Sequence, residues 1–352
     1  MYDIIPSFIT AFFITYFAIP SIIKIAHEKN LMDEPDERRA HTDRVPTLGG
    51  IGIFAGLIFS ITYWIPFDSC LHPEHEYIKY ILCAYIIIFL IGAKDDIIPL
   101  PAYKKFVGQL AAAFILVYQA KIQLTSLYGI FGINDIPEWF SIIITMFTII
   151  VIINAFNLID GINGLAGSIG LLTCFSFGFW FYLFGRLDLA VLSAATMGSL
   201  LAFLKYNFTP AKIFMGDTGS LLLGLTSSIL AISFIENNKI IHEQYFITSV
   251  PAVAIAVMII PLFDTLRVFV IRLLKGKSPF SPDKTHIHHL LLDLGYNHSQ
   301  STFILVVVNI LFITIAYFLR SLGALEIILI ILGLASLLTL WVFKKVQLTK
   351  KN

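Results

Sequence analysis

Residues 80–101 read YILCAYIIIFLIGAKDDIIPLP, an apolar run that ends in two adjacent acids, Asp95 and Asp96. A membrane-spanning helix needs about 20 predominantly apolar residues, and this run with its flanks is of that kind. Carboxylates at a membrane edge are energetically costly and by default mark a functional site. Three further acids lie at or inside the ends of apolar segments: Asp160, Asp217 and Asp264. The chain is therefore predicted to form one acidic site if all five acids reach the same face of the membrane.

Apolar segments recur along the whole chain, which is 57% hydrophobic and only 13% charged over 352 residues. An ordinary soluble domain carries about 25% charged residues, so the composition excludes that class. We expect eleven transmembrane helices, at about 3–26, 48–66, 77–93, 104–120, 138–156, 164–184, 187–206, 219–235, 247–273, 301–319 and 323–343. Because no large polar region remains outside them, the prediction is an all-α, polytopic integral membrane protein with a single domain over residues 1–352.

The distribution of Lys and Arg predicts the orientation of these helices. If the N-terminus lies outside, nineteen of the 24 basic residues fall in cytoplasmic parts of the chain. The other side holds only five: Lys79, Lys121, Arg186, Lys239 and Arg320. Cytoplasmic loops are enriched in Lys and Arg, so this bias predicts an N-out, C-in topology. A miscounted helix would break the alternation of the loops, so the same bias supports eleven segments.

In this topology four separate stretches bring the acids to the cytoplasmic face. Asp95 and Asp96 end one inward-running segment, and Asp160 follows another. Asp217 lies in the cytoplasmic loop KYNFTPAKIFMGDTGS. The ninth segment carries Asp264 about nine residues before its end, hence about 13 Å below the interface at 1.5 Å per residue. Their convergence predicts one acidic, metal-loaded site.

The adjacent acids Asp95 and Asp96 are followed about nine positions later by Lys104 and Lys105. Two carboxylates with basic residues nearby suit metal-assisted phosphate chemistry. The alternative is that the Asp pair only marks the water boundary of a helix.

The stretch NLIDGING, residues 157–164, is a second candidate. Its glycines permit a tight turn, and amides at the start of the following helix can hold an anion. Asn157, Asp160 and Asn163 recur every three residues, so they share one face of a helical turn. The alternative is a polar turn between two spans.

The stretch FMGDTGS, residues 214–220, places Asp217 at the start of a helix. A carboxylate there can be a simple N-cap. It is also where a phosphate-bound Mg²⁺ would be held, because Mg²⁺ prefers one or two carboxylates plus substrate oxygens. Phe214 is a candidate for stacking on a base.

The loop KSPFSPDKTHIHH, residues 277–289, ends in His286, His288 and His289. Without an HExxH helix, phosphate or sugar binding is favoured over zinc, and structural hydrogen bonding is the other alternative. Asp264 and Arg267 lie three residues apart on one helix, so an internal salt bridge is an alternative to a site role for Asp264.

Taken together, these stretches resemble the polyprenyl-phosphate N-acetylhexosamine-1-phosphate transferases, in order and over nearly the full chain. The matching stretches are DERRAHTDRVPTLGG, GAKDD with K…Q after it, NAFNLIDGINGLAGS, YNFTPAKIFMGDTGS and RLLKGKSPFSPDKTHIHH. The histidine loop, the eleventh span and the length are similar to the bacterial undecaprenyl-phosphate GlcNAc-1-phosphate transferase branch rather than to the phospho-MurNAc-pentapeptide translocase.

The resemblance implies an enzyme of the bacterial inner membrane with its active site on the cytoplasmic face. It would transfer GlcNAc-1-phosphate from UDP-GlcNAc to undecaprenyl phosphate, giving GlcNAc-diphospho-undecaprenol and UMP, as the first membrane step of a cell-surface polysaccharide. Mg²⁺, or Mn²⁺ in its place, is the expected cofactor. Membrane lipids are expected partners, a homodimer is a further expectation, and no nucleic-acid partner is expected.

The resemblance also implies residue roles. Asp217 is the expected Mg²⁺ ligand with Asn157 alongside, and Asp95 is the candidate base for the lipid phosphate with Asp96 close by. Because a phosphate monoester has a second pKa of about 6, Asp95 is expected to position groups as much as to remove a proton. Asp160 would hold the active-site turn or the nucleotide. The expected substrate-binding residues are Asn163, Phe214, Asn154, Lys104, Lys105, Arg44, Asp264, His286, His288 and His289.

The chain departs from the family pattern at one position, and three alternative functions are left open. Many bacterial members read NLxDGxDG where this chain has Asn163, which keeps hydrogen bonding but removes the charge. The same chemistry with another UDP-N-acetylhexosamine is an alternative. A secondary transporter would show inverted repeats with broken helices near the midplane. An intramembrane metalloprotease would need metal-binding histidines on a helix beside an acid.

Overall fold

The computed structural model describes residues 3–31, 45–66, 75–240, 246–276 and 285–349. Within these ranges the chain is helical and forms no β-strand. The helices are α1 (Ile4–Glu28), α2 (Gly49–Trp64), α3 (Ile78–Ile97), α4 (Ala102–Tyr118), α5 (Glu138–Ile159), α6 (Leu165–Leu183), α7 (Leu187–Asn207), α8 (Gly216–Asn237), α9 (Val250–Val257), α10 (Ile259–Leu274), α11 (Ile287–Asp293), α12 (His298–Phe318) and α13 (Ala324–Thr349), with short 3₁₀ turns at Ile130–Gly132 and Asn238–Ile240. The predicted all-α class is confirmed.

Every predicted apolar segment coincides with a helix or, for the ninth segment, with two. Seven helices are long and apolar enough to cross a membrane: α1, α5, α6, α7, α8, α12 and α13. The bent pair α9–α10 adds an eighth if it counts as one span. The chain is thus a multi-pass membrane protein, while the number eleven and the N-out orientation stay predictions.

The ninth predicted segment, residues 247–273, is not the single straight helix that we expected. It breaks at Met258, and α9 and α10 meet at 84°. Asn309, fully buried on α12, stabilises the break, because it accepts from the amide of Ile260 at 3.4 Å and donates to the carbonyl of Val257 at 3.0 Å. Backbone groups released by a broken helix need such partners inside a membrane. The nine residues from Asp264 to residue 273 lie within α10 and still span about 13 Å along that helix. The predicted depth of Asp264 also assumed that the whole segment runs along the membrane normal, which α9 and α10 cannot both do, so the depth stays a prediction.

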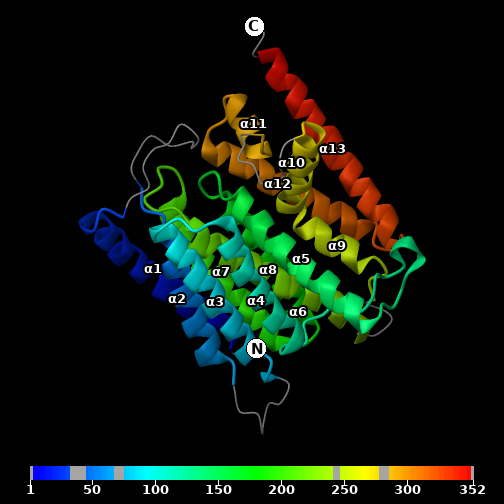
Figure 1. Cartoon of the computed structure of the whole chain (residues 1–352), viewed down its shortest axis with the longest axis horizontal. Coiled ribbons are helices and arrows are strands. Elements are labelled where there is room, and N and C mark those ends of the chain that lie inside the picture. The colour runs from blue at the N-terminus through cyan, green and yellow to red at the C-terminus, as the bar shows by residue number, and fades with distance from the viewer. Residues whose placement is uncertain (1–2, 32–44, 67–74, 241–245, 277–284, 350–352) are drawn as a thin grey trace.

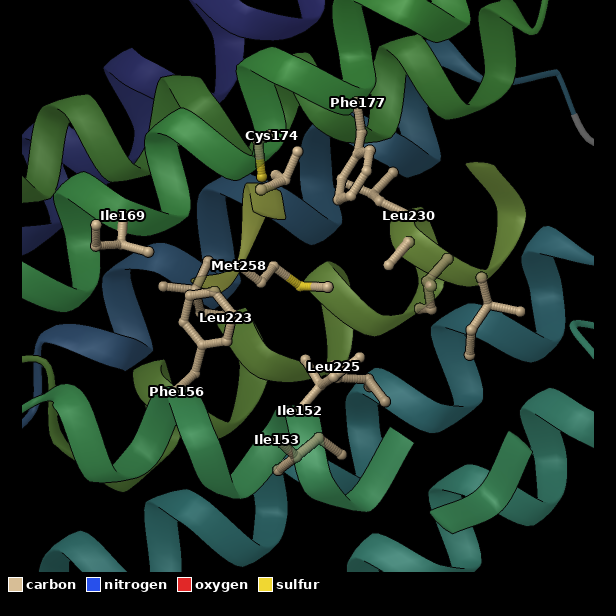
Figure 2. Close-up of a cluster of buried hydrophobic side chains, with 14 of the residues drawn as sticks. Ile152, Ile153, Phe156, Ile169, Cys174, Phe177, Leu223, Leu225, Leu230 and Met258 are labelled. Atoms are coloured by element: carbon tan, nitrogen blue, oxygen red, sulfur yellow. The ribbon is translucent and has the colours of Figure 1, made fainter. Parts of the chain in front are cut away.

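Helix α8 lies at the centre of the bundle and packs against α2, α3, α5 and α6 (Figure 1). Its membrane-length stretch is entirely buried by protein, whereas the outer helices α1 and α13 bury less than a third of theirs. Figure 2 shows how its leucines pack with apolar side chains of neighbouring helices. The labelled side chains are Ile152, Ile153 and Phe156 of α5, Ile169, Cys174 and Phe177 of α6, Leu223, Leu225 and Leu230 of α8, and Met258 beside the bend.

The end of α3 approaches the beginning of α8 unusually closely. A Cβ atom added to Gly92 would lie 2.4 Å from the Cα atom of Thr218, so only glycine permits this contact. The approach brings the last turn of α3, with its two acids, against the first turn of α8. Helix packing therefore brings the Asp95–Asp96 pair next to the FMGDTGS stretch.

Candidate active site

A cavity of about 570 Å³ lies where α3 and α5 end and α8 begins. Many of the predicted site residues line it: Asp95, Asp96, Asn157, Asp160, Asn163, Phe214, Asp217 and His289. Its wall also includes Thr47, Ile97, Pro99, Gly161, Ile162, Asn207, Gly216 and His298. The structure thus brings three of the four acid-bearing stretches together around one cavity. The prediction that Asp264 of the ninth segment joins the same acidic site is wrong, because Asp264 does not line this cavity.

Lys105 joins two acids of the cavity wall that come from different helices, although it is not itself among the lining residues. Its ammonium nitrogen lies 2.6 Å from a carboxylate oxygen of Asp95 and 2.6 Å from one of Asp217. The other oxygen of Asp95 accepts from the amide of Leu100 at 2.6 Å, in the turn between α3 and α4. All three charged side chains are largely but not fully buried, which strengthens their attraction relative to a pair in water.

Asp96 caps the first turn of α8 from outside the helix. One carboxylate oxygen accepts from the amide of Asp217 at 2.7 Å, and the other accepts from the amide and the hydroxyl of Thr218. The first amides of a helix have no partner within the helix, and they favour negative charge. Asp96 lies beyond the end of the predicted membrane span. Its burial by protein raises its pKa to about 7, although the hydrogen bonds from Thr218 act to lower the pKa. Asp96 therefore holds the segment that carries Asp217.

Asn157 and Asp160 come from the end of α5. The amide nitrogen of Asn157 donates to Asp217 at 3.1 Å and to the hydroxyl of Ser220 at 2.9 Å. Asp160 follows the last residue of the helix, and burial, together with the charges of Asp217 and Asp96, raises its pKa well above the usual range. Asn157 thus contacts Asp217 directly, whereas the negative charge of Asp217 favours the protonated form of Asp160.

Of the described part of the histidine loop, residues 285–289, only His289 lines the cavity. His286 is buried and its Nδ1 lies 2.8 Å from a carboxylate oxygen of Asp264. His288 packs against Gly161, where an added Cβ would lie 2.4 Å from its Nε2. Burial lowers the pKa of His288 to about 3, so its ring is neutral at physiological pH. The three neighbouring histidines therefore occupy three different environments.

Four further predicted residues lie away from the cavity or outside the described ranges. Asn154 pairs with Gln109, donating to its side-chain oxygen at 2.8 Å. Lys104 is exposed beside Tyr103. Asp264 is buried and forms a salt bridge with Arg267, which is the alternative that their spacing in the sequence allowed. The fourth, Arg44, lies outside the described residues.

The comparison with curated proteins supplies the family. A family model described as "Glycosyl transferase family 4" matches residues 78–235. The chain is 31% identical over 294 residues to the undecaprenyl-phosphate alpha-N-acetylglucosaminyl 1-phosphate transferase of Escherichia coli (strain K12), covering 80% of this chain and 74% of the relative. The chain belongs to glycosyl transferase family 4.

Two further relatives of this family 4 chain have similar identity. A probable undecaprenyl-phosphate N-acetylglucosaminyl 1-phosphate transferase of Bacillus subtilis (strain 168) is 32% identical, over 91% of this chain and 86% of the relative. A decaprenyl-phosphate N-acetylglucosaminephosphotransferase of Mycobacterium tuberculosis is 32% identical, over 84% of this chain and 78% of the relative. The resemblance found in the motifs is therefore confirmed, and the chain is an enzyme of the glycosyltransferase class.

Three polar residues that line the cavity of this family 4 chain were not predicted from the sequence. His298 accepts from the amide of Asn163 at 3.4 Å, and Asn207 accepts from the amide of Gly164 at 2.7 Å. The third is Thr47. Asn207 and Thr47 lie inside stretches that carried the resemblance, YNFTP and PTLGG, and a polar residue there was the available signal. No local pattern marked His298, which begins α12 and reaches the cavity by packing.

The donor set of the cavity fits a divalent cation that favours oxygen. Asp95, Asp96, Asp160 and Asp217 offer carboxylates, and Asn157 offers an amide. The ammonium of Lys105 between Asp95 and Asp217 shows that positive charge is favoured at that place. In the described part of the chain, no three or more His, Cys, Asp or Glu side chains are arranged to hold a metal ion. Mg²⁺ needs only one or two protein carboxylates, because substrate oxygens complete its ligands, and Asp217 with Asn157 beside it would meet that need.

Proposed function

We propose that this chain transfers GlcNAc-1-phosphate from UDP-GlcNAc to undecaprenyl phosphate and releases UMP. One observation carries the proposal. Lys105 joins Asp95 and Asp217 in a cavity walled by the NLIDGING turn, in a chain similar to relatives named for this transfer. The inner membrane and its cytoplasmic face are the proposed location, supported by the positive-inside bias of the sequence.

The reaction has an explicit bond balance. A phosphate oxygen of the lipid forms a bond to the sugar-bearing phosphorus of UDP-GlcNAc. The bond from that phosphorus to the bridging oxygen breaks, and UMP leaves with that oxygen. Two anionic substrates must approach each other, so neutralising negative charge is the main task of the site.

The residues that we propose for this task are Asp217, Asn157, Asp95 and Lys105. Asp217 and Asn157 would hold Mg²⁺, or Mn²⁺ in its place, which when bound neutralises charge on the diphosphate and on the leaving UMP. Lys105 provides the fixed positive charge for the lipid phosphate. Asp95, held by Lys105 and the amide of Leu100, orients that phosphate and accepts its proton when one is present.

Four other residues of the cavity wall are proposed to take the nucleotide and the sugar. Phe214 offers a ring for the uracil, and Asn163 and Asp160 offer hydrogen bonds from the NLIDGING turn. His289 faces the cavity and is proposed to contact the sugar or the diphosphate. The identity of the sugar depends on this wall, so another UDP-N-acetylhexosamine remains the alternative substrate.

The test is the release of UMP by the purified chain in detergent, with undecaprenyl phosphate and UDP-GlcNAc, with and without Mg²⁺ or Mn²⁺. We expect release that requires the lipid and the metal and that stops with a chelator. Release only from another UDP-N-acetylhexosamine would overturn the proposed sugar and keep the chemistry. Folded protein that releases no UMP from any UDP-sugar would overturn the transferase proposal and favour a transporter.

A further inference from the structure

Asp264 lies outside the cavity, yet both of its carboxylate oxygens have partners. Its side chain is 1% exposed on α10. One carboxylate oxygen accepts from Arg267 at 2.7 Å and from the amide of Ile287 at 2.9 Å. The other lies 2.8 Å from Nδ1 of His286. A buried carboxylate is tolerated when it has this many partners.

These contacts clamp three consecutive residues to α10. Arg267, which binds Asp264, also donates to the carbonyl oxygen of Thr285. His286 and Ile287 bind Asp264 itself through a ring nitrogen and a backbone amide. The entry to α11 is therefore held from residue 285 to residue 287 by one carboxylate and its neighbouring guanidinium.

The clamp determines where His289 lies. Helix α11 is only seven residues long, and so short a helix is not stable by itself. The amide of His289 donates to the carbonyl of His286 at 3.0 Å, so the position of His289 follows that of His286. The buried side chains Leu290 and Leu291 anchor the far part of this helix. The near part, which faces the cavity, is held by the contacts of Asp264 with His286 and Ile287, and His288 packs against Gly161 beside them.

The bend at Met258 makes the clamp possible. A straight continuation of α9 would carry Asp264 in another direction, because the two helices meet at 84°. Asn309 holds that bend by satisfying backbone groups on each side of the break. The break in the ninth segment thus places a buried acid beside the histidine loop.

We propose that Asp264 is a positioning residue: together with Arg267 and His286 it fixes the entry to α11 and so holds His289 in the wall of the active site. His286 then serves the fold of the loop, and His289 serves the substrate. This inference rests on the proposed function for its catalytic consequence, which is binding of UDP-GlcNAc. The clamp itself is a property of the protein without substrate.

The first arm of the test measures the rate of amide hydrogen exchange of the peptide covering residues 285–293 in the full chain, which reports on the clamp without substrate. In Asp264→Asn, which keeps the size of the side chain but removes its charge, we expect exchange of this peptide to become about tenfold faster or more. The matched control is Asp293→Asn, an exposed acid on the same short helix, and we expect wild-type exchange from it. Unchanged exchange in Asp264→Asn would overturn the proposal.

The second arm reads the consequence for substrate binding. We expect Asp264→Asn to raise KM for UDP-GlcNAc about tenfold, with a smaller change in kcat and no change in KM for the lipid. His286→Leu should lose affinity for UDP-GlcNAc. His286→Asn keeps a nitrogen near the place of Nδ1, so it should retain most of that affinity. Equal loss in both His286 variants would show direct substrate contact and overturn the positioning role. If the wild type releases no UMP, the proposed function fails, while the exchange arm still decides whether the clamp exists.

Discussion

The ammonium nitrogen of Lys105 lies 2.6 Å from the carboxylate of Asp217, although 112 residues separate the two in the chain. The contact links the start of α4 to the start of α8, and Asp95 extends it to the end of α3. A cation between two carboxylates is the arrangement that a phosphate-transfer site needs before its anionic substrates arrive.

The two acids that bind Lys105 should be essential for turnover. We expect Asp217→Ala and Asp95→Asn each to reduce UMP release about 100-fold or more, because each removes charge from the centre of the site. Both proteins should elute as the wild type does in size-exclusion chromatography. Asp135→Asn, an exposed acid in the loop before α5, is the control and should keep wild-type activity. Near-full activity in well-folded Asp217→Ala would contradict the metal assignment.

The two adjacent lysines should differ sharply. Lys105→Met removes the cation between Asp95 and Asp217, so UMP release should fall about 100-fold or more. Lys104→Met removes an exposed charge beside Tyr103, and its activity should stay within about threefold of wild type. Similar losses in the two variants would argue that the lysines act together on the lipid phosphate.

Gly92 should tolerate no side chain. In Gly92→Ala the new Cβ would meet the backbone of Thr218 at 2.4 Å, so α3 must move away from α8. We expect a loss of about 1–3 kcal/mol in the free energy of unfolding. Activity should fall as well, because Asp96 would leave the amide of Asp217. Gly333→Ala on α13, where an added Cβ meets nothing within 4 Å, is the matched control. Its thermal midpoint should equal or exceed that of the wild type.

Neutral, buried His288 should make the protein less stable in acid. Its pKa lies at about 3 in the folded state, well below the value of about 6.5 for an unfolded chain. Between these pH values the His288 ring binds a proton only in the unfolded chain. Neutral His288 therefore lowers the free energy of unfolding progressively as the pH falls from about 6.5 toward 3, and has no such effect above about pH 6.5. We expect the thermal midpoint in detergent to fall between pH 7 and pH 4.5.

The variant His288→Gln should show a shallower fall over the same range. His27→Gln, at an exposed histidine near the end of α1, should keep the wild-type slope. A slope in His288→Gln as steep as in the wild type would assign the pH dependence to other groups.

The positions of the helices and the gathering of the acids were predictable because both follow from local patterns. An apolar run long enough to cross a membrane forms a helix whatever surrounds it, since its backbone groups must be satisfied within the segment. The alternation of basic loops then placed Asp95, Asn157 and Asp217 at one end of the bundle, and the cavity indeed lies between their helices. The motifs were specific enough to identify the family.

What the sequence could not decide depends on how the helices are rotated and packed against one another. Adjacent lysines project about 100° apart on a helix, so only the packing of α4 shows that Lys105 rather than Lys104 meets the acids. The break at Met258 has a local signal in Pro261, whose missing N–H leaves the carbonyl of Val257 without its helical partner. The sequence could not show what satisfies that carbonyl, because the partner is Asn309, about 50 residues later. His298 enters the site for the same reason, through the position of α12. Local apolar pattern determined which residues form helices and which end carries the acids, whereas long-range packing decided which side chains touch.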